Sequence, residues 1–393
     1  MAEDSVSLAE MRDSLRACGS TKFMEYLRRL QPDEAFTILG KFLSVTGRNI
    51  PGDNPKALPK GMGKVLFALA NLARSARLKL SEPLKSIVAS FLAALDRKAE
   101  FIPEGSAPPA PPNPGKMSTI RRASLDGVPG FFKSCFDIGS KGSNLVPDQA
   151  QRGGFSFKNA LIAERNELAY AVAEGLGFPG RCARACMATL DAEVGLFSEE
   201  VAGSMVADVR SDTLRSFNDG QKISLIRQLL QMEAIDAITG EMDPNSGNVK
   251  LDVTGENVCL AAYDRDYGFG EIKTLAEAFD VSSFFITQLP FSSKEVLDAV
   301  ARFRAERYPE LVARMNGMGF PQKQVEAMSR RVEELERRLE NLNAAGKIAS
   351  NDEDLLTLAR GYVTFRPPNS RIPRYENRLL RIMFAPAAVP KTK

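Results

Sequence analysis

From Asp236 to Asp266 the sequence reads D-A-I-T-G-E-M-D-P-N-S-G-N-V-K-L-D-V-T-G-E-N-V-C-L-A-A-Y-D-R-D. Residues 222–237, which lead into this stretch, carry apolar residues at three-to-four spacing and predict a helix. Two apolar runs, residues 249–251 and 258–263, flank a Thr-Gly turn and predict a β-hairpin. The stretch therefore predicts a helix, a short polar loop and a hairpin in direct succession.

The polar residues of this stretch are of the types that phosphoryl transfer requires. In that chemistry one carboxylate orients the attacking hydroxyl, and an Asn and an Asp hold Mg²⁺ against the phosphates. Asn248 follows Asp243 by five positions, which is the spacing in the protein-kinase pattern H-R-D-x-x-x-x-N. Asp264 and Asp266 follow the hairpin. A purely structural interpretation stays open, because D-P-N-S-G-N also favours turns and the run Asp264-Arg265-Asp266 could form a surface ion pair.

Composition narrows the classes of protein that the chain can belong to. It has 393 residues, 44% hydrophobic and 26% charged, which is ordinary for a globular protein of two domains. A formal net charge of +3 gives no reason to expect a nucleic-acid partner, and no apolar window is long enough for a transmembrane segment. The absence of histidine excludes Ser-His-Asp and Cys-His hydrolases and His-ligated zinc. Five scattered cysteines suit reduced thiols in a cytoplasm.

The composition and the predicted secondary structure of the sequence change twice along the chain. Residues 1–101 show repeated helical periodicity and predict a helical bundle. Residues 102–118 are rich in Pro and Ala and predict a linker. Residues 119–393 begin with mixed strands and helices and end in helices, among them 293–308 and 321–342. The second of these carries one apolar stripe, for which packing on its own domain is a simpler interpretation than a coiled coil.

Short strands are predicted at residues 130–136, 154–158, 187–190 and 194–198, with a helix over 160–177. The run I-R-R-A-S-L, ending at Leu125, has two interpretations. It resembles a phosphorylation site for a basophilic kinase, but a solvated strand entry is the simpler explanation.

Three blocks of the region from about residue 130 to 300 resemble the phosphatidylinositol-kinase-like branch of the protein kinase fold. That branch includes actin-fragmin-type kinases, toxin–antitoxin serine kinases and bacterial kinase-like effectors. The family patterns G-x-x-S-E-x-x-x-G, D-x-x-x-G-N-x-D-R-H-x-x-N and I-D-N-D-x-x-F-G are similar to G-L-F-S-E-E-V-A-G at 195–203, to the residues at 236–248, and to Y-D-R-D-Y-G-F-G at 263–270. The resemblance implies an α+β fold, a two-lobed protein-kinase-like domain that is preceded here by an all-α helical domain.

The resemblance also implies a role for each candidate residue, with ATP and Mg²⁺ as cofactors. Lys158 matches the lysine that holds the phosphates, and either Glu167 or Glu164 matches its helix partner. Gly139 and Gly142 lie in a Gly/Ser turn that looks like a phosphate-covering loop. The matches in the stretch quoted above are the catalytic base Asp243 and the metal ligands Asn248 and Asp264.

One departure bears on activity. Where the family has Arg-His after the catalytic Asp, this chain has Pro244 and Asn245, which brace a loop less well because Pro supplies no donor. The leading hypothesis is a kinase that phosphorylates a protein Ser/Thr hydroxyl. The alternatives are a pseudokinase or interaction scaffold on the same fold, and a kinase fold reused for AMP or glutamyl transfer. The resemblance further implies a bacterial protein that is cytoplasmic or is secreted as an effector into a host cytosol, with a host activator among the partners to test.

Overall fold

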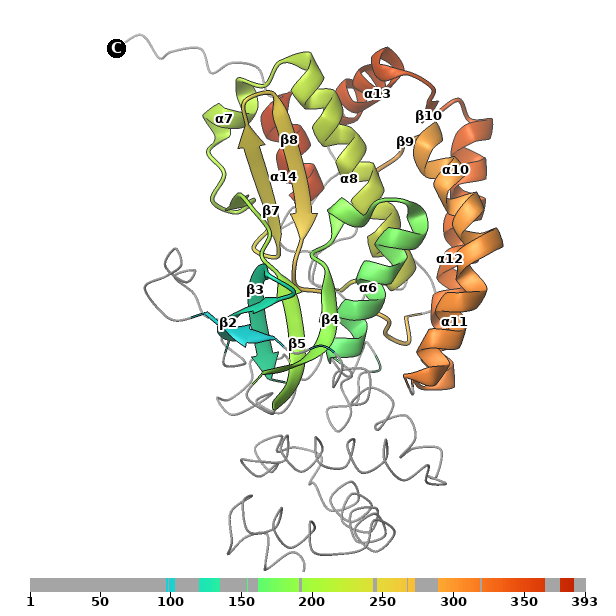
Figure 1. Cartoon of the computed structure of the whole chain (residues 1–393). Coiled ribbons are helices and arrows are strands. Elements are labelled where there is room, and N and C mark those ends of the chain that lie inside the picture. Colours follow the sequence, from blue (N-terminus) through green and yellow to red (C-terminus); the bar gives the residue numbers. More distant parts are fainter. Residues whose placement is uncertain are drawn as a thin grey trace, which may run out of the picture.

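The computed structural model describes residues 97, 99–102, 120–134, 154, 162–190, 193–242, 246–266, 268–272, 289–318, 320–364 and 375–384. The predicted helical bundle and linker lie almost wholly outside the described residues. The described part combines two antiparallel sheets, of five and three strands, with helices (Figure 1), so the predicted α+β class is confirmed. No described helix combines the length and apolarity that a membrane span requires.

A five-stranded antiparallel sheet lies at one end of the described domain (Figure 1). Its strands, in spatial order, are β1 (Glu100–Phe101), β2 (Ile120–Leu125), β3 (Val128–Ser134), β5 (Glu193–Glu199) and β4 (Ala185–Leu190). Asp126 and Gly127 join β2 to β3, with φ values of 54° and 78°. Two positive φ angles at an Asp-Gly pair are typical of the tight hairpin turns that match strand twist. The I-R-R-A-S-L run is therefore an ordered strand, as its simpler interpretation predicts.

The sheet buries one face through alternating small and aromatic residues. Its core contains Ala123, Leu125, Phe132, Cys186, Ala188, Leu190 and Phe197. Helix α6 (Ile162–Leu176) packs against β4, and the 3-10 turn η2 (Pro179–Arg181) returns the chain to the sheet. The predicted helix over 160–177 and the predicted strands near 130, 187 and 194 are confirmed.

A second, smaller sheet joins the helical region of the domain. It consists of β6 (Ser204–Met205), β7 (Val249–Thr254) and β8 (Asn257–Ala262), and β7 and β8 form the predicted hairpin. Helix α7 (Ser211–Arg215) precedes α8 (Asp219–Thr239), which packs against β8. Asn218 and Gln221 form a reciprocal capping box at the start of α8, and Gly240 ends the helix in the left-handed region at φ 63°. Sequence-encoded caps thus fix where the polar loop begins.

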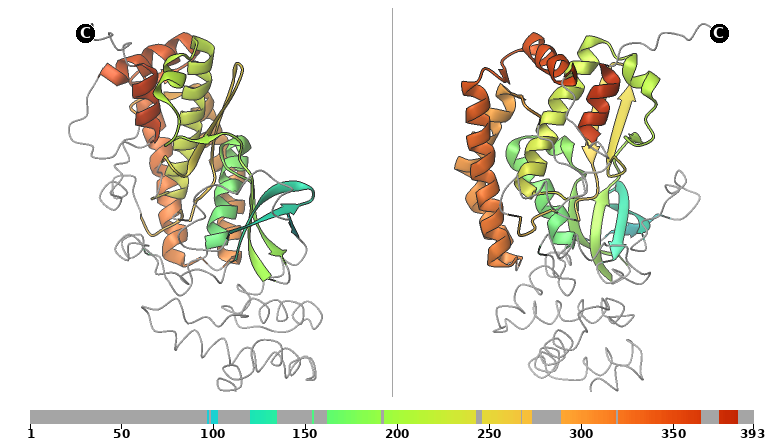
Figure 2. Two further views of the ribbon diagram at one scale, coloured as in Figure 1. Left: turned by 90° about the vertical axis from the view of Figure 1, so that its left-hand side faces the viewer. Right: turned by 180° about the vertical axis from the view of Figure 1, so that it is seen from behind.

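Helices complete the domain on the side of α8 and α6 away from the five-stranded sheet (Figure 2). They are α10 (Lys294–Arg302), the π-helical turn η3 (Phe303–Arg307), α11 (Tyr308–Gly317), α12 (Gln322–Ala344), α13 (Asp352–Thr364) and α14 (Tyr375–Met383). Two-residue strands β9 (Ser292–Ser293) and β10 (Ile348–Ala349) pair in parallel before α10 and α13. The apolar stripe of α12 is buried in the large core. Packing on its own domain, the simpler of the two interpretations, is therefore confirmed.

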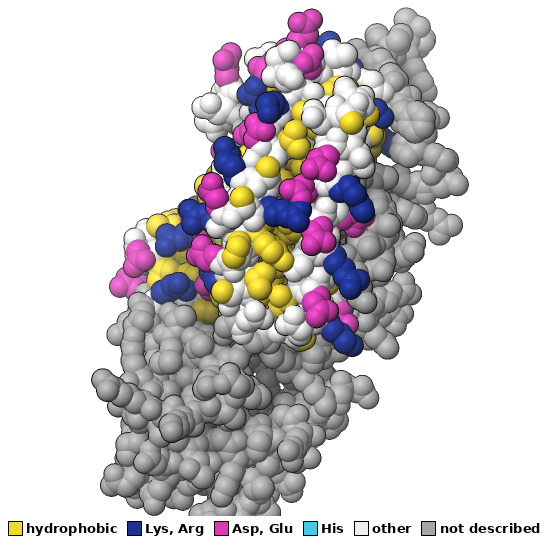
Figure 3. All heavy atoms as spheres, turned by 90° about the vertical axis from the view of Figure 1, so that its right-hand side faces the viewer, with side chains coloured by type: hydrophobic (Ala, Val, Ile, Leu, Met, Phe, Trp, Pro, Cys, Tyr) yellow, Lys and Arg dark blue, Asp and Glu magenta, His cyan; other side chains and the backbone are white. Residues whose placement is uncertain are grey.

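Over the face formed by α10, α11 and α12, basic and acidic side chains are interspersed (Figure 3). Hydrophobic atoms gather between them, and neither sign of charge dominates this face. A mixed surface of this kind lacks the single-sign field that steers a protein to nucleic acid.

Candidate functional site

The candidate site lies where β3, α6 and the segment that follows β8 meet. Lys133 near the end of β3 donates to Asp266 Oδ2 at 2.6 Å, and its Nζ lies 4.0 Å from Asp264 Oδ1. Asn166 on α6 donates to Asp266 Oδ1 at 2.8 Å and accepts from the backbone N–H of Arg265 at 3.0 Å. Three parts of the chain far apart in sequence therefore converge on two aspartates.

The three residues Asp264, Arg265 and Asp266 alternate in direction. The Asp264 side chain is 42% exposed, whereas that of Asp266 is 18% exposed and engaged by Lys133 and Asn166. Arg265 points the other way and forms a buried ion pair with Asp236, near the end of α8. The Asp-Arg-Asp run thus presents one accessible carboxylate to solvent while its two neighbours anchor the segment.

The Lys133 contact also changes the electrostatics of Asp266. Burial on its own raises the pKa of Asp266. The nearby Lys133 ammonium, together with hydrogen bonds donated by Lys133 and Asn166, outweighs that effect and lowers the pKa below its ordinary value. Asp266 is therefore a carboxylate at neutral pH, and it neutralises part of the Lys133 charge.

Asn248 is held beside this segment by the hairpin. The β7–β8 register pairs Val249 with Ala262, and the Tyr263 N–H donates to the Asn248 carbonyl at 3.1 Å, which extends the ladder by one residue. The Tyr263 hydroxyl donates to the Gly247 carbonyl. Asn248 thus lies opposite Tyr263, the residue that precedes Asp264.

Two buried arginines secure the backbone around the aspartates. Arg165 on α6 donates to the Gly268 carbonyl, and Arg331 on α12 donates to the carbonyls of Gly270 and Ile272 at 3.4 and 2.5 Å. Both side chains are fully buried. Burial lowers the pKa of each guanidinium to about 9, so both remain cations at neutral pH.

Not every predicted site residue falls within this arrangement. Glu167 is buried on α6, but its carboxylate accepts from the Met187 N–H and from Arg314, both at 3.1 Å. It therefore ties α6 to β4 and α11, and the neighbouring Asn166 is the α6 side chain that reaches Asp266. Glu164, the other predicted helix partner, is half-buried on the same helix. Four predicted residues, Asp243, Lys158, Gly139 and Gly142, lie outside the described residues.

Lys133 is the main residue that sequence reasoning missed. The strand at 130–136 is predicted, and Lys133 follows two phenylalanines in it. The predicted strand places this lysine near a strand end, but the sequence offers no local sign that its side chain reaches Asp264 and Asp266. Asn166, Arg165 and Arg331 carry no local signal of this kind.

The oxygen atoms that Asp264 and Asn248 offer are of a type that suits Mg²⁺. A carboxylate at Asp264 and an amide oxygen at Asn248 are hard oxygen ligands of the type that Mg²⁺ prefers. Among the described residues no group of three or more acidic or cysteine side chains is arranged to hold a metal alone. Because Mg²⁺ in phosphotransferases is bound by one or two carboxylates together with substrate phosphates, a sparse protein set of this kind is sufficient.

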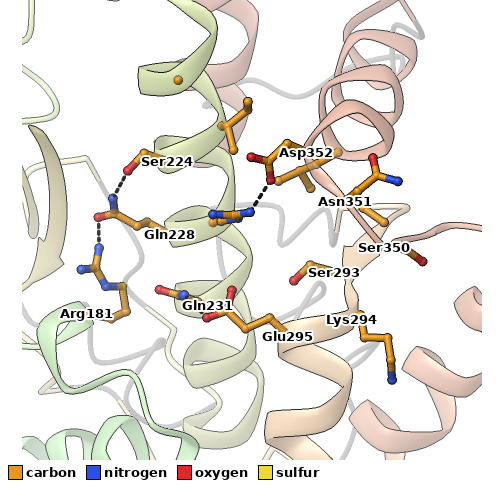
Figure 4. Close-up of a pocket in the computed structure, with 15 residues that line it drawn as sticks. Arg181, Ser224, Gln228, Gln231, Ser293, Lys294, Glu295, Ser350, Asn351 and Asp352 are labelled. Atoms are coloured by element: carbon orange, nitrogen blue, oxygen red, sulfur yellow. Dashed lines mark hydrogen bonds and ion pairs between the residues drawn. The ribbon is translucent and has the colours of Figure 1, made fainter. Parts of the chain in front are cut away.

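A separate cavity of about 630 Å³ opens between α8 and the starts of α10 and α13 (Figure 4). Its polar groups are largely engaged with one another: Arg227 pairs with Asp352, Arg181 donates to Gln228, and Gln231 donates to Glu295. None of the described residues that line it is a predicted site residue. The cavity is distinct from the Lys133 site.

Comparisons with known proteins give a distant likeness among solved structures. No protein-family model matches the sequence, and no curated protein matches it. Among solved structures, the chain is similar to the Helicobacter pylori proinflammatory kinase CtkA, with a TM-score of 0.36 and 12% sequence identity. The similarity covers 62% of this chain and 97% of that chain.

Proposed function

We propose that the chain is an ATP- and Mg²⁺-dependent kinase that transfers phosphate to a protein Ser/Thr hydroxyl. The observation that carries the proposal is the convergence of Lys133, Asp264 and Asp266. Asn248 lies beside them on the hairpin, opposite the residue that precedes Asp264. A strand lysine, an accessible aspartate and a loop asparagine are the parts with which a kinase site holds phosphates and metal.

Each described residue has a distinct part in the proposed site. Lys133 binds phosphate oxygens, and Asp264 and Asn248 bind the metal ion. Asp266 and Asn166 orient Lys133 and the backbone of the segment. Bound Mg²⁺ supplies charge neutralisation at the phosphates. Asp243, which lies outside the described residues, is proposed to accept the proton of the attacking hydroxyl, and Gly139 and Gly142 to cover the phosphates.

Lys133 takes the role that the family resemblance suggests for Lys158. Support for this exchange comes from position, because Lys133 lies on the strand that leads to α6 and contacts both aspartates. Lys133 is then linked to α6 indirectly, because Asp266 accepts hydrogen bonds from both Lys133 and Asn166. Glu167 stabilises the position of the helix.

The test is Mg·ATP binding and turnover by the purified full chain. Nucleotide-dependent thermal shift and label transfer from γ-labelled ATP are measured for wild type, Asp264→Asn and Lys133→Met. Loss of one electrostatic contact to a reacting group typically lowers turnover about 10²- to 10³-fold. Lys294→Met is the matched control, because it removes an exposed Lys–Asp298 pair of 2.8 Å elsewhere. Transfer that survives in both site variants would contradict the proposal.

The nature of the acceptor is tested separately. Label transfer to a panel of protein substrates is compared with transfer to phosphoinositide vesicles, with and without host-cell extract as a source of activator. A protein acceptor is favoured because the sequence offers no basic or amphipathic segment for docking to a membrane. The likeness to kinase-like effectors makes host cytosolic proteins the first panel to use.

A nucleotide-binding protein without turnover is the second candidate function. Two observations favour it: Pro244 and Asn245 replace the Arg-His of the family pattern, and α6 presents Asn166 instead of a carboxylate to the site. A thermal shift with Mg·ATP that is abolished by Lys133→Met, without label transfer under any condition, would establish this candidate.

A further inference from the structure

Arg331 bridges two segments that are far apart in sequence. From α12 its guanidinium donates to the carbonyls of Ile238 and Thr239 at 3.1 and 3.2 Å, at the end of α8. It also donates to the carbonyls of Gly270 and Ile272, at 3.4 and 2.5 Å. One fully buried cation thus binds the backbone before the Asp243 loop and the backbone after Asp266.

The end of α8 is shaped to receive this guanidinium. The last carbonyls of a helix lack partners within the helix, and the helix dipole favours a cation there. Gly240 follows these carbonyls, and a Cβ at that position would lie 2.7 Å from Arg331 Cζ. The glycine of the D-x-x-x-G motif is therefore required both by its left-handed φ of 63° and by the close approach of Arg331.

Arg165 holds the same segment from the other side. From α6 it donates to the Gly268 carbonyl and, at 3.0 Å, to Gln324 on α12. Its guanidinium also lies over the Phe320 ring, with Cζ 5.2 Å from the centroid. Residues 268–272 are consequently held between a helix of the sheet region and a helix of the C-terminal region.

If Arg165 and Arg331 only filled space in the core, apolar side chains would be more favourable at both positions. Burying a charge is unfavourable unless its donors are satisfied, and an apolar side chain avoids the penalty. The planar fork of Arg offers five donors in fixed directions, and so it can join several carbonyls of two segments. The side-chain type therefore matches a bridging role.

We propose that Arg165 and Arg331 form a clamp that positions the Asp264–Asp266 segment against the end of α8, and that Arg331 is a positioning residue for phosphate transfer. The second half of this proposal rests on the proposed kinase function. Arg331 fixes the spacing between the end of α8 and the segment that carries Asp264. A misplacement of about 1 Å in such a site can lower turnover about 100-fold.

The experiment compares Arg331→Lys, Arg331→Met and Arg165→Met with Arg338→Met in the full chain. Arg338 is the matched control: it lies two turns further along α12, donates to the Leu289 carbonyl and pairs with Glu233 at 3.2 Å. Hydrogen exchange of peptides covering residues 236–242 and 264–272 is measured together with kcat, KM for ATP and the Mg²⁺ dependence of turnover.

The clamp predicts faster exchange in these two peptides for Arg331→Met and Arg331→Lys, and in 264–272 for Arg165→Met. It predicts wild-type exchange there for Arg338→Met. Arg331→Lys keeps a charge at the end of α8 but cannot span both segments, so it should lose some thermal stability while it stays folded at the assay temperature. Its kcat should nevertheless fall about 100-fold, with a raised Mg²⁺ requirement and little change in KM for ATP.

Unchanged exchange in these peptides, or loosening no greater than in Arg338→Met, would overturn the clamp. A fall in kcat that merely follows the folded fraction would overturn the positioning role of Arg331. If the wild-type chain transfers no phosphate, the proposed function fails, and the exchange data alone then uphold or overturn the clamp.

Discussion

The buried ion pair of Asp236 and Arg265 offers the sharpest test of how far the sequence blocks 236–248 and 263–270 stabilise each other. Asp236 belongs to α8 and Arg265 to the segment after β8, and their side chains are only 3% and 4% exposed. Asp236→Asn removes the negative charge but keeps the size of the side chain, and Arg265→Met removes the positive charge. Each single change leaves one buried charge without its partner.

The expected magnitude follows from this burial. Removing one member of a buried pair typically costs about 3–5 kcal/mol, because the remaining charge stays desolvated. We expect Asp236→Asn to lose about 3 kcal/mol, at the low end, because Asn still offers a hydrogen-bond acceptor, and Arg265→Met to lose at least as much. The double variant should lose about 2 kcal/mol less than the sum of the singles, within the range of coupling found for contacting residues.

Urea unfolding of all four proteins measures the coupling, with midpoints and slopes recorded at pH 7. Arg227→Met is the control, because its pair with Asp352 is about half exposed, at 47% and 52%, and should contribute under about 1 kcal/mol. Additive losses in the double variant would refute the reasoning. So would an Asp236→Asn variant no less stable than the Arg227→Met control.

Three further outcomes follow from the same structure. The folded-state pKa of Asp266 is lowered, so its stabilisation is complete above the unfolded pKa of about 3.9 and is lost as pH falls below it; urea unfolding from pH 7 to pH 3 should show the gap between wild type and Asp266→Asn narrowing. Gly240→Ala should lower the free energy of unfolding by more than the ~1–2 kcal/mol that Ala costs in the left-handed region, because its Cβ meets the buried guanidinium of Arg331. Gly255→Ala, at φ 61° with open space around it, should cost only that backbone amount by the same urea assay. Burial raises the pKa of Cys182 to about 11, so iodoacetamide at pH 8 should label the exposed Cys259 much faster, as peptide mass spectrometry can show.

Local patterns in the sequence predict the elements of the fold well. The hairpin of β7 and β8, the helix α8 with its caps and the buried stripe of α12 are each encoded by periodicity or turn residues within one segment. Such signals depend on nearest neighbours along the chain, and so a single sequence reveals them. Residues 100–101 are different: they form β1 against β2, a pairing that no local pattern in the Pro-rich surroundings indicates.

The candidate site is only partly encoded in this local way. Asp264 and Asn248 lie on the hairpin ends, so their proximity follows from the hairpin register. The contact of Lys133 with Asp266 joins residues 133 positions apart, and which lysine fills that place depends on how the sheet packs against the later segment. Likewise, Glu167 and Asn166 are adjacent in sequence, and only helix rotation decides which one faces the aspartates.

For the proposed kinase, the charges of the described site residues predict that metal and nucleotide bind together. Lys133 carries one positive charge, and two carboxylates lie within 4.0 Å of it. The group therefore has a net negative charge, which repels a triphosphate that arrives without a cation. In the proposed kinase, a divalent ion at the half-exposed Asp264 would reverse that sign and would free Lys133 to contact phosphate oxygens as well as Asp266. The arrangement suits binding of Mg·ATP as a unit, and a site that bound free ATP equally well would have to use other charges.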